Sequence, residues 1–206
     1  ADATEMSGIQ RDLLHLAYER LEDGPDLESL ERAVDAAARE YGFHRETILA
    51  VKRRLATLRA MGVFRGGMGV PPVEEGKPLV VDSGTGLSGR ASRALVGALV
   101  WYLFELRKQG EVPPLALIVD EAHRYLPQEE EAFSKSSLRI VAREGRKFGM
   151  GLIIASQRVV GLDKDVLSQC GTKIVMRMDS PTDMAMLRPL LGKSASLLPS
   201  LPRGVA

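Results

Sequence analysis

The sequence has 206 residues, of which 45% are hydrophobic and 27% charged, and its formal net charge is +1. A chain of this size can bury a core of its own, and its near-zero charge provides no overall basic field for nucleic acid. Its single cysteine, Cys170, excludes an internal disulfide, no run approaches the roughly 20 apolar residues that cross a bilayer, and no signal peptide is recognisable, so we expect a cytoplasmic protein without membrane contact.

Three amphipathic helices are predicted in the first third of the chain. Apolar residues recur at helical spacing over residues 9–21, and again over residues 48–61. The helix between them begins at Asp26, whose carboxylate can accept hydrogen bonds from the first-turn amides, and ends at Gly42, which suits a left-handed exit. We expect these helices to form a small packed subdomain.

The pattern changes at residue 79 to short runs of branched apolar residues, separated by segments long enough for helices. This alternation predicts parallel strands with helical crossovers, buried on both faces. The segment over residues 90–108 is apolar almost all round, which predicts a buried helix with Trp101 in the core. The four predicted strands are LVVD (79–82), LALIVD (115–120), GLIIAS (151–156) and KIVMRM (173–178).

A glycine-rich stretch, GTGLSG at residues 84–89, matches the GxGxxG pattern of dinucleotide-binding folds. In that fold, an acid that binds the ribose follows about twenty residues later, whereas Asp120 stands about thirty residues past Gly89. We therefore interpret the stretch as a turn that connects a strand to its helix.

The sequence GKS at residues 192–194 resembles the end of a phosphate-binding loop, GxxxxGK[ST]. The first glycine of that motif would stand at position 187, which is Leu187, and Pro189 lies within the segment that leads to the lysine. No GxxxxGK[ST] sequence, the Walker A motif, occurs anywhere in the 206 residues.

The stretch LALIVDEAHRYLP, residues 115–127, is an aliphatic run that ends abruptly in Asp120 and Glu121. This pattern matches the Walker B motif of ATPases, in which the aspartate holds Mg²⁺ through water and the glutamate deprotonates the attacking water. Because buried carboxylates are costly unless they are paired or bind a metal, two acids at a strand end predict a functional site.

A cationic stripe follows the two acids. Arg139, Arg143 and Arg146 recur at i, i+4 and i+7, and the strand after them ends in Ser156 and Gln157. A solvated helix face is the alternative interpretation of such a stripe. The Gln157 amide at a neighbouring strand end predicts contact with an ATP γ-phosphate or its attacking water.

Three stretches, taken together, resemble the HerA branch of the HerA–FtsK family of hexameric DNA-translocating ATPases. DEAH at residues 120–123 also resembles superfamily 2 helicases, but the Ser-Ala-Thr motif and the distant arginine motif of those enzymes are missing. The helical segment and the stretch over residues 79–106 resemble the HerA branch too. The three stretches are LALIVDEAHRYLP (115–127), VAREGRKFGMGLIIASQR (141–158) and LSQCGTKIVMRMDSPTDMAML (167–187).

The resemblance implies an α/β fold, a partial RecA-like P-loop NTPase core with a mainly parallel sheet and an N-terminal helical subdomain. It divides the chain into a helical insert at residues 1–66, a linker at 67–78 and an ATPase core at 79–206. Because the family carries Walker A before the helical insert, we expect that motif in a segment outside these 206 residues, and we expect little ATP hydrolysis by this chain alone.

The resemblance also implies the roles of individual residues. Asp120 would hold Mg²⁺ and Glu121 would be the base, while Gln157 would contact the γ-phosphate of ATP. Arg146, or failing that Arg143, would reach a neighbouring subunit's nucleotide as an arginine finger. His123 would hydrogen-bond around the acids. Candidates for DNA contact are Lys135 and Arg139.

The function implied by the resemblance is a DNA motor. The full protein would form a homo-hexamer, move double-stranded DNA, and partner the NurA nuclease in end resection for recombinational repair. Two alternatives stay open: a different motor of the same family, serving conjugation, secretion or chromosome segregation, and a non-catalytic module that binds DNA ends or assists assembly.

Overall fold

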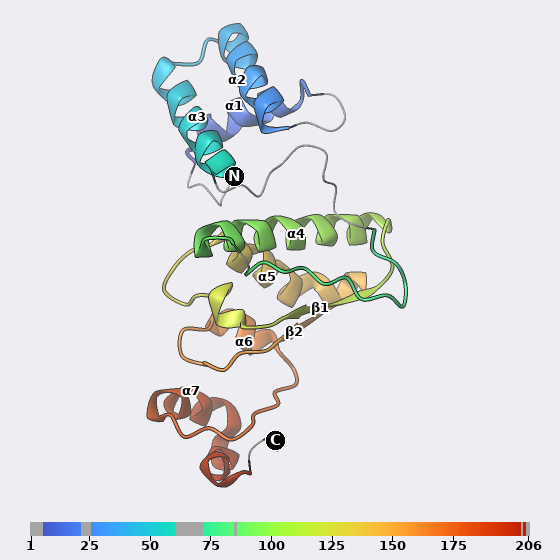
Figure 1. The fold of residues 1–206 in the computed structure, drawn as a ribbon, viewed down its shortest axis with the longest axis vertical. Helices are drawn as coiled ribbons and strands as arrows, with labels where there is room; N and C mark the ends of the chain where they lie inside the picture. Colours follow the sequence, from blue (N-terminus) through green and yellow to red (C-terminus); the bar gives the residue numbers. More distant parts are fainter. Residues whose placement is uncertain (1–5, 22–25, 61–71, 85, 203, 205–206) are drawn as a thin grey trace. The chain divides into compact units, whose positions relative to one another are not determined.

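The structure, a computed structural model, describes residues 6–21, 26–60, 72–84, 86–202 and 204. The chain divides into two compact units, each with its own contacts (Figure 1). The first unit comprises residues 1–73 and 78–95, and the second comprises residues 74–77 and 96–206. The predicted helix ends near residues 24 and 62, and residues 67–71 of the predicted linker, lie outside the described residues.

The first unit contains the three predicted helices: α1 (Gly8–Tyr18), α2 (Leu27–Tyr41) and α3 (Arg45–Ala60). The Asp26 carboxylate caps α2 by accepting a 2.6 Å hydrogen bond from the Ser29 amide, and Gly42 ends the helix in the left-handed region at φ 68°. Both predicted helix signals are confirmed. The helices bury a shared apolar core that comprises Leu13, Ala17, Ala33, Val34, Ala37, Ala38, Val51 and Leu55.

Helix α4 (Gly89–Gln109) buries one stripe of its surface, including Val100, Leu103 and Phe104. The prediction that Trp101 lies in the core is wrong, because 42% of its surface is exposed. The helix is rich in apolar residues on every side, but the described residues provide packing partners for only part of its circumference.

A two-stranded parallel sheet lies at the centre of the second unit. Strand β1 (Leu115–Val119) pairs in register with β2 (Met150–Ile154), so that Val119 lies opposite Ile154. The crossover between them contains the 3-10 turns η2 (Ala122–Arg124) and η3 (Gly145–Phe148) and helix α5 (Phe133–Glu144). This arrangement confirms the predicted α/β fold with a parallel sheet.

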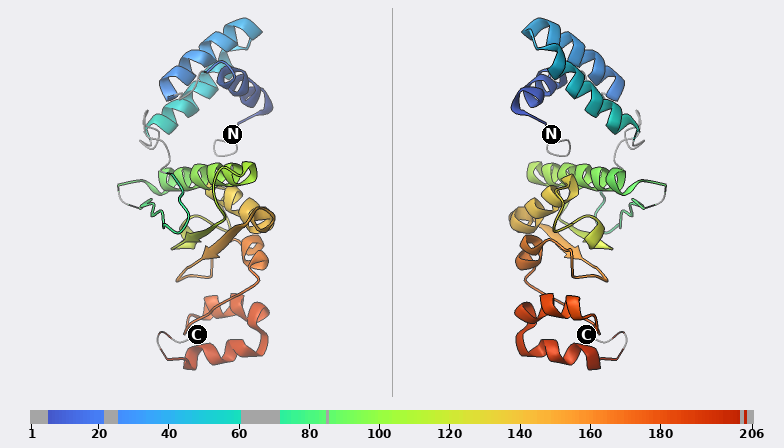
Figure 2. Two further views of the ribbon diagram at one scale, coloured as in Figure 1. Left: turned by 90° about the vertical axis from the view of Figure 1, so that its right-hand side faces the viewer. Right: turned by 90° about the vertical axis from the view of Figure 1, so that its left-hand side faces the viewer.

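Within the described residues, only one face of the sheet is covered. Helix α5 packs on that face beside α4 (Figures 1 and 2), and Val119 and Met150 point into this packing. On the opposite face Ile118 and Ile153, which are register partners, are 68% and 53% exposed. The prediction that these strands are buried on both faces is therefore wrong for the described part of the chain.

Two of the four predicted strands do not form strands. Residues 79–82 and 173–178 have no strand assignment, and the apolar side chains of Val80 and Ile174 are exposed. A strand needs a hydrogen-bonded neighbour, and within the described residues the only paired strands are β1 and β2. Branched apolar composition alone was therefore insufficient to place a strand here.

The end of the chain forms a small helical hairpin. Helices α6 (Lys164–Gln169) and α7 (Pro181–Leu191) are followed by the 3-10 segment η4 (Gly192–Ser200). Segments α7 and η4 share their own apolar core, against which Val159 of the loop after β2 also packs. The sequence GKS at residues 192–194 thus follows a helix and not a strand, in agreement with the prediction that it is not a phosphate-binding loop.

Close packing of α4 on α5 depends on Gly97. A Cβ atom at this position would lie 2.7 Å from the backbone of both Phe133 and Ser134. The Gly97 carbonyl also accepts a 2.9 Å hydrogen bond from the Ser137 hydroxyl. The two helices therefore approach each other more closely than any residue with a side chain allows.

We expect Gly97→Ala to lower the free energy of unfolding by about 1–3 kcal/mol, because backbone atoms at 2.7 Å cannot be relieved by rotating a side chain. The matched control is Gly89→Ala at the start of the same helix, where an added Cβ meets nothing within 4 Å. Urea unfolding of both variants checks this expectation. Equal stability of the two variants would contradict the close helix contact.

Candidate functional site

The two acids of the Walker B-like stretch lie at the carboxyl end of β1. Glu121 has φ 47° and ψ 44°, and it is the only non-glycine residue with positive φ in the described chain. The left-handed region costs a residue with a Cβ roughly 1–2 kcal/mol. This conformation is held by hydrogen bonds from the Ala155 amide to the Val119 carbonyl and from the Ala122 amide to the Ala155 carbonyl, both 2.9 Å.

A polar cluster forms where the acids meet the end of β2. The Gln157 amide Nε2 donates a 2.7 Å hydrogen bond to Glu121 Oε1. The His123 Nδ1 atom lies 3.3 Å from Glu121 Oε2 and 3.1 Å from Ser156 Oγ. The parallel pairing of the strands therefore joins residues 36 positions apart into one group, and Gln157 and His123 each face one carboxylate oxygen of Glu121.

Asp120 fits a magnesium site of the kind that ATPases use. Its side chain is exposed, and Oδ1 accepts a 2.8 Å hydrogen bond from the Glu121 amide. No cluster of three or more His, Cys, Asp or Glu ligands occurs in the described part of the chain. Mg²⁺ beside a nucleotide is commonly held by one or two carboxylates together with phosphates and water, so a single exposed carboxylate suits that role.

The predicted DNA contacts, Lys135 and Arg139, lie in an ionic cluster with Glu131, Asp163 and Asp165. The Lys135 side chain is 2% exposed, and its ammonium donates to the Gln128 and Glu130 carbonyls and to Glu131 Oε1 at 2.9–3.2 Å. This arrangement argues against a phosphate contact by Lys135, because all three ammonium donors are used within the protein.

Arg139 is held in the same cluster. Its guanidinium makes two hydrogen bonds to the Asp163 carboxylate, of 3.2 and 2.7 Å. Asp163, 1% exposed, also caps α6 by accepting from the Val166 amide at 3.0 Å. Burial alone would raise the pKa of Asp163, but hydrogen bonds from Arg139 and Val166 outweigh it, and the net pKa lies below its usual value.

The two predicted arginine fingers differ in their surroundings. Arg143 lies 3.5 Å from Asp165 and so extends the ionic cluster of α5 and α6. Arg146 lies beyond the end of α5, in η3, and its exposed side chain makes no ion pair or hydrogen bond within the described residues. The expected continuous helical stripe is thus interrupted at Gly145.

Arg146 lies at the opposite end of β2 from Gln157. Strand pairing extends from Gly149, whose carbonyl accepts from the Leu115 amide, to Ala155. Six residues in extended conformation, at about 3.3 Å each, separate these ends by about 20 Å. Arg146 therefore lies away from the acids of its own chain, and its predicted role as an arginine finger towards a neighbouring subunit stays a prediction.

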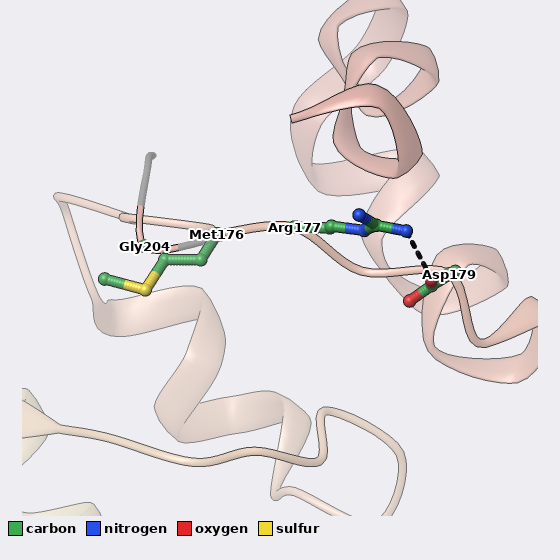
Figure 3. Close-up of a pocket in the computed structure, with 4 residues that line it drawn as sticks. All are labelled: Met176, Arg177, Asp179 and Gly204. Carbon is green, nitrogen blue, oxygen red and sulfur yellow. Dashed lines mark hydrogen bonds and ion pairs between the residues drawn. The ribbon is translucent and has the colours of Figure 1, made fainter. Parts of the chain in front are cut away.

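A cavity of about 310 Å³ lies elsewhere, near the C-terminus (Figure 3). It is lined by Met176, Arg177, Asp179 and Gly204, and Arg177 faces Asp179 at 3.3 Å. None of the predicted catalytic or binding residues lines it. The cavity is therefore separate from the polar cluster at the carboxyl ends of β1 and β2.

The surroundings of Cys170 disfavour a nucleophilic thiolate. Burial raises the pKa of its thiol, with Lys173 acting in the opposite direction. A raised pKa disfavours the thiolate, which is the nucleophilic form.

Among the described helices, none combines the length and hydropathy that a bilayer-spanning helix needs.

The fold and the strand-end acids define the class of protein. No family model matches the chain. The solved structure of VirB4 of Thermoanaerobacter pseudethanolicus matches 97% of this chain and 60% of that chain with a TM-score of 0.67 and 16% identity. The chain therefore shares its fold with this part of VirB4.

Sequence comparison finds relatives among the HerA helicases. The chain is 34% identical over 127 residues to the DNA double-strand break repair helicase HerA of Sulfurisphaera tokodaii, which is 58% of this chain and 26% of the relative. It is 49% identical over 70 residues to HerA of Pyrococcus furiosus, 34% of this chain and 13% of the relative. The predicted resemblance to HerA is confirmed, and the chain matches about a quarter or less of these relatives' length.

The lowered pKa of Asp163 gives the ionic cluster a defined pH dependence. A carboxyl group with a depressed folded-state pKa stabilises the protein above its unfolded pKa, near 3.9, and loses this effect as the pH falls through the folded value. We expect Asp163→Asn to lower the unfolding free energy by about 3 kcal/mol at pH 7, and this difference to shrink below about pH 4.

Urea unfolding between pH 3 and pH 7 measures this difference. Asp179→Asn is the matched control, because Asp179 forms only an exposed ion pair with Arg177. A gap between wild type and Asp163→Asn that stays constant with pH would contradict the ionic origin of the effect.

Proposed function

We propose that the full protein is an ATP-driven motor that moves double-stranded DNA in the repair of double-strand breaks. The observation that carries this proposal is the pairing of Glu121 with Gln157 at the end of a P-loop ATPase sheet, in a chain similar to HerA helicases. We further propose, from the HerA resemblance, assembly as a homo-hexamer and action with the NurA nuclease in end resection.

The geometry supports a division of work between the two carboxylates. Glu121 acts as the base that takes a proton from the attacking water, and its contact with His123 holds the carboxylate at the strand end. Asp120 holds Mg²⁺ through water, and the ion neutralises charge on the phosphates when it is bound. Gln157 turns its amide from Glu121 towards the γ-phosphate when ATP is present.

Arg146 serves as the arginine finger of a neighbouring subunit in this proposal. Its guanidinium is exposed and makes no ion pair in the described part of the chain, whereas Arg143 is held near Asp165. The sheet separates Arg146 from Gln157 of its own chain by about 20 Å. An arginine at the amino end of β2 can therefore contact only the nucleotide bound to another copy.

The phosphate cradle of the proposed motor comes from outside these 206 residues, because no GxxxxGK[ST] sequence is present in them. Backbone amides and the lysine of such a loop provide most of the contacts with the β- and γ-phosphates. We therefore expect the 206-residue chain alone to bind ATP weakly and to hydrolyse it poorly.

A second candidate is another motor of the HerA–FtsK family, which would use the same ATPase residues with a different substrate or partner. The fold likeness to VirB4 over 97% of the chain supports it, while identities of 34–49% to HerA proteins support the repair motor. DNA-stimulated ATP hydrolysis with and without NurA, measured on the native protein, separates the two candidates.

Loss of the proposed base tests the catalytic assignment. In the native protein containing these residues, we expect Glu121→Gln to lower kcat for ATP hydrolysis at least about 10²-fold while nucleotide binding persists, because only proton transfer is removed. Glu129→Gln, at an exposed acid outside the cluster, is the matched control. Near-normal turnover by Glu121→Gln would remove the base assignment.

Mixed assemblies test whether Arg146 acts between subunits. We expect Arg146→Ala and Glu121→Gln each to be inactive alone, with an arginine effect of about 10³-fold. Mixing them should restore part of the ATPase activity, because some interfaces then join an intact Arg146 to an intact Glu121. Arg143→Ala serves as control, and a mixture no more active than its separate parts would contradict the role in trans.

A further inference from the structure

The loop that follows β2 carries Gln157 and is anchored by a carboxylate from a distant helix. The amides of Val159 and Val160 both donate to Oδ1 of Asp183, at 2.9 and 2.8 Å. Asp183 lies in the first turn of α7, and its side chain is buried. Two consecutive backbone donors therefore depend on one oxygen atom of one side chain.

A second set of contacts joins the same loop to the α7–η4 hairpin. The Val159 side chain packs against the hairpin core formed by Met184, Leu187, Ala195 and Leu198. On the other side of Gln157, Ser156 Oγ donates to the Arg158 carbonyl at 2.7 Å and accepts from the Arg158 amide at 3.2 Å. The backbone that carries Gln157 is thus fixed immediately before and after this residue.

Asp183 is well suited to act as a fixed charge. Burial alone would raise its pKa, but hydrogen bonds from Val160, Ser180 and Val159 outweigh that effect, and the net pKa is lowered. Hydrogen bonds to a charged acceptor are stronger than neutral ones. A carboxylate that remains ionised holds both amides over the whole neutral range.

We propose that Asp183 is a positioning residue, which holds residues 158–160 so that the Gln157 amide faces Glu121 and which couples the α7–η4 hairpin to the site. This inference rests on the proposed role of Gln157. Any displacement of the hairpin changes the position of two amides that begin only two residues after Gln157. The hairpin can in this way set whether Gln157 is available to nucleotide.

Three substitutions separate this role from simple stabilisation of the hairpin. Asp183→Leu keeps an apolar group of similar size but removes the acceptor. Asp183→Asn keeps an oxygen in the place of Oδ1, and one amide oxygen can accept both hydrogen bonds. Asp179→Asn is the matched control on the same segment, because Asp179 is exposed and pairs only with Arg177.

The first measurement is NMR on the 206-residue chain, without nucleotide. In Asp183→Leu we expect amide exchange at Val159 and Val160 to accelerate on the order of tenfold or more, and the Gln157 side-chain amide signals to move to the positions seen in Glu121→Ala. Asp183→Asn and the Asp179 control should keep wild-type signals. Faster exchange at both valines with unchanged Gln157 signals would overturn the positioning role.

The hairpin signals of Met184 and Leu198 report whether Asp183→Leu still folds. If the hairpin unfolds in that variant, Asp183→Glu decides the question, because one added methylene displaces the carboxylate without removing its charge. We then expect shifted Gln157 signals with the hairpin signals retained, and unshifted Gln157 signals would contradict the proposal.

The second measurement is ATP hydrolysis by the native protein. We expect Asp183→Leu to lower kcat about tenfold or more with little change in KM, and Asp183→Asn to restore most of kcat. A rise in KM with unchanged kcat would contradict the coupling to Gln157. Absence of ATPase activity in the wild-type protein would refute the proposed function, whereas the NMR result on Asp183 and Gln157 would stand independently.

Discussion

The parallel pairing of β1 with β2 is the interaction on which the rest of the site depends. It places the two acids after Val119 next to the polar residues after Ile154, although these groups are far apart in the sequence. Backbone hydrogen bonds of Ala155 continue the pairing past both strands and hold Glu121 in its left-handed conformation. Strained backbone of this kind persists only where the surrounding contacts determine it, which is the case at this strand end.

The same pairing separates the acids from Arg146. Helix α5 returns the chain to the start of β2. Residues late in the crossover therefore lie at the amino ends of the strands, whereas Glu121 lies at their carboxyl ends. In the proposed mechanism, one chain therefore presents only part of the catalytic groups at each end of the strands. A ring in which Arg146 of one copy faces Glu121 of the next copy would complete each site. This geometry motivates the proposed assembly.

Sequence patterns predicted local features better than long-range ones. The cap at Asp26, the exit at Gly42 and the strand that ends just before Asp120 depend on neighbouring residues and were confirmed. The burial of Trp101, the second covered face of the sheet and the strands at residues 79–82 and 173–178 depend on partners that the local sequence does not specify, and those predictions were wrong. Contact between Asp183 and the loop after Gln157 had no local signal at all.

The fate of the cationic stripe follows from the same reasoning. Helical spacing correctly placed Arg139 and Arg143 on one side of α5, but spacing could not reveal that α6 brings Asp163 and Asp165 to that side. These acids convert most of the stripe into a structural cluster that joins α5 to α6. Arg146 is not part of this pairing, because α5 ends at Glu144 and Arg146 already lies in η3. The position at which α5 ends, and not the helical spacing of the arginines, therefore leaves Arg146 without an ion pair in the described residues, as the proposed contact with a neighbouring subunit needs.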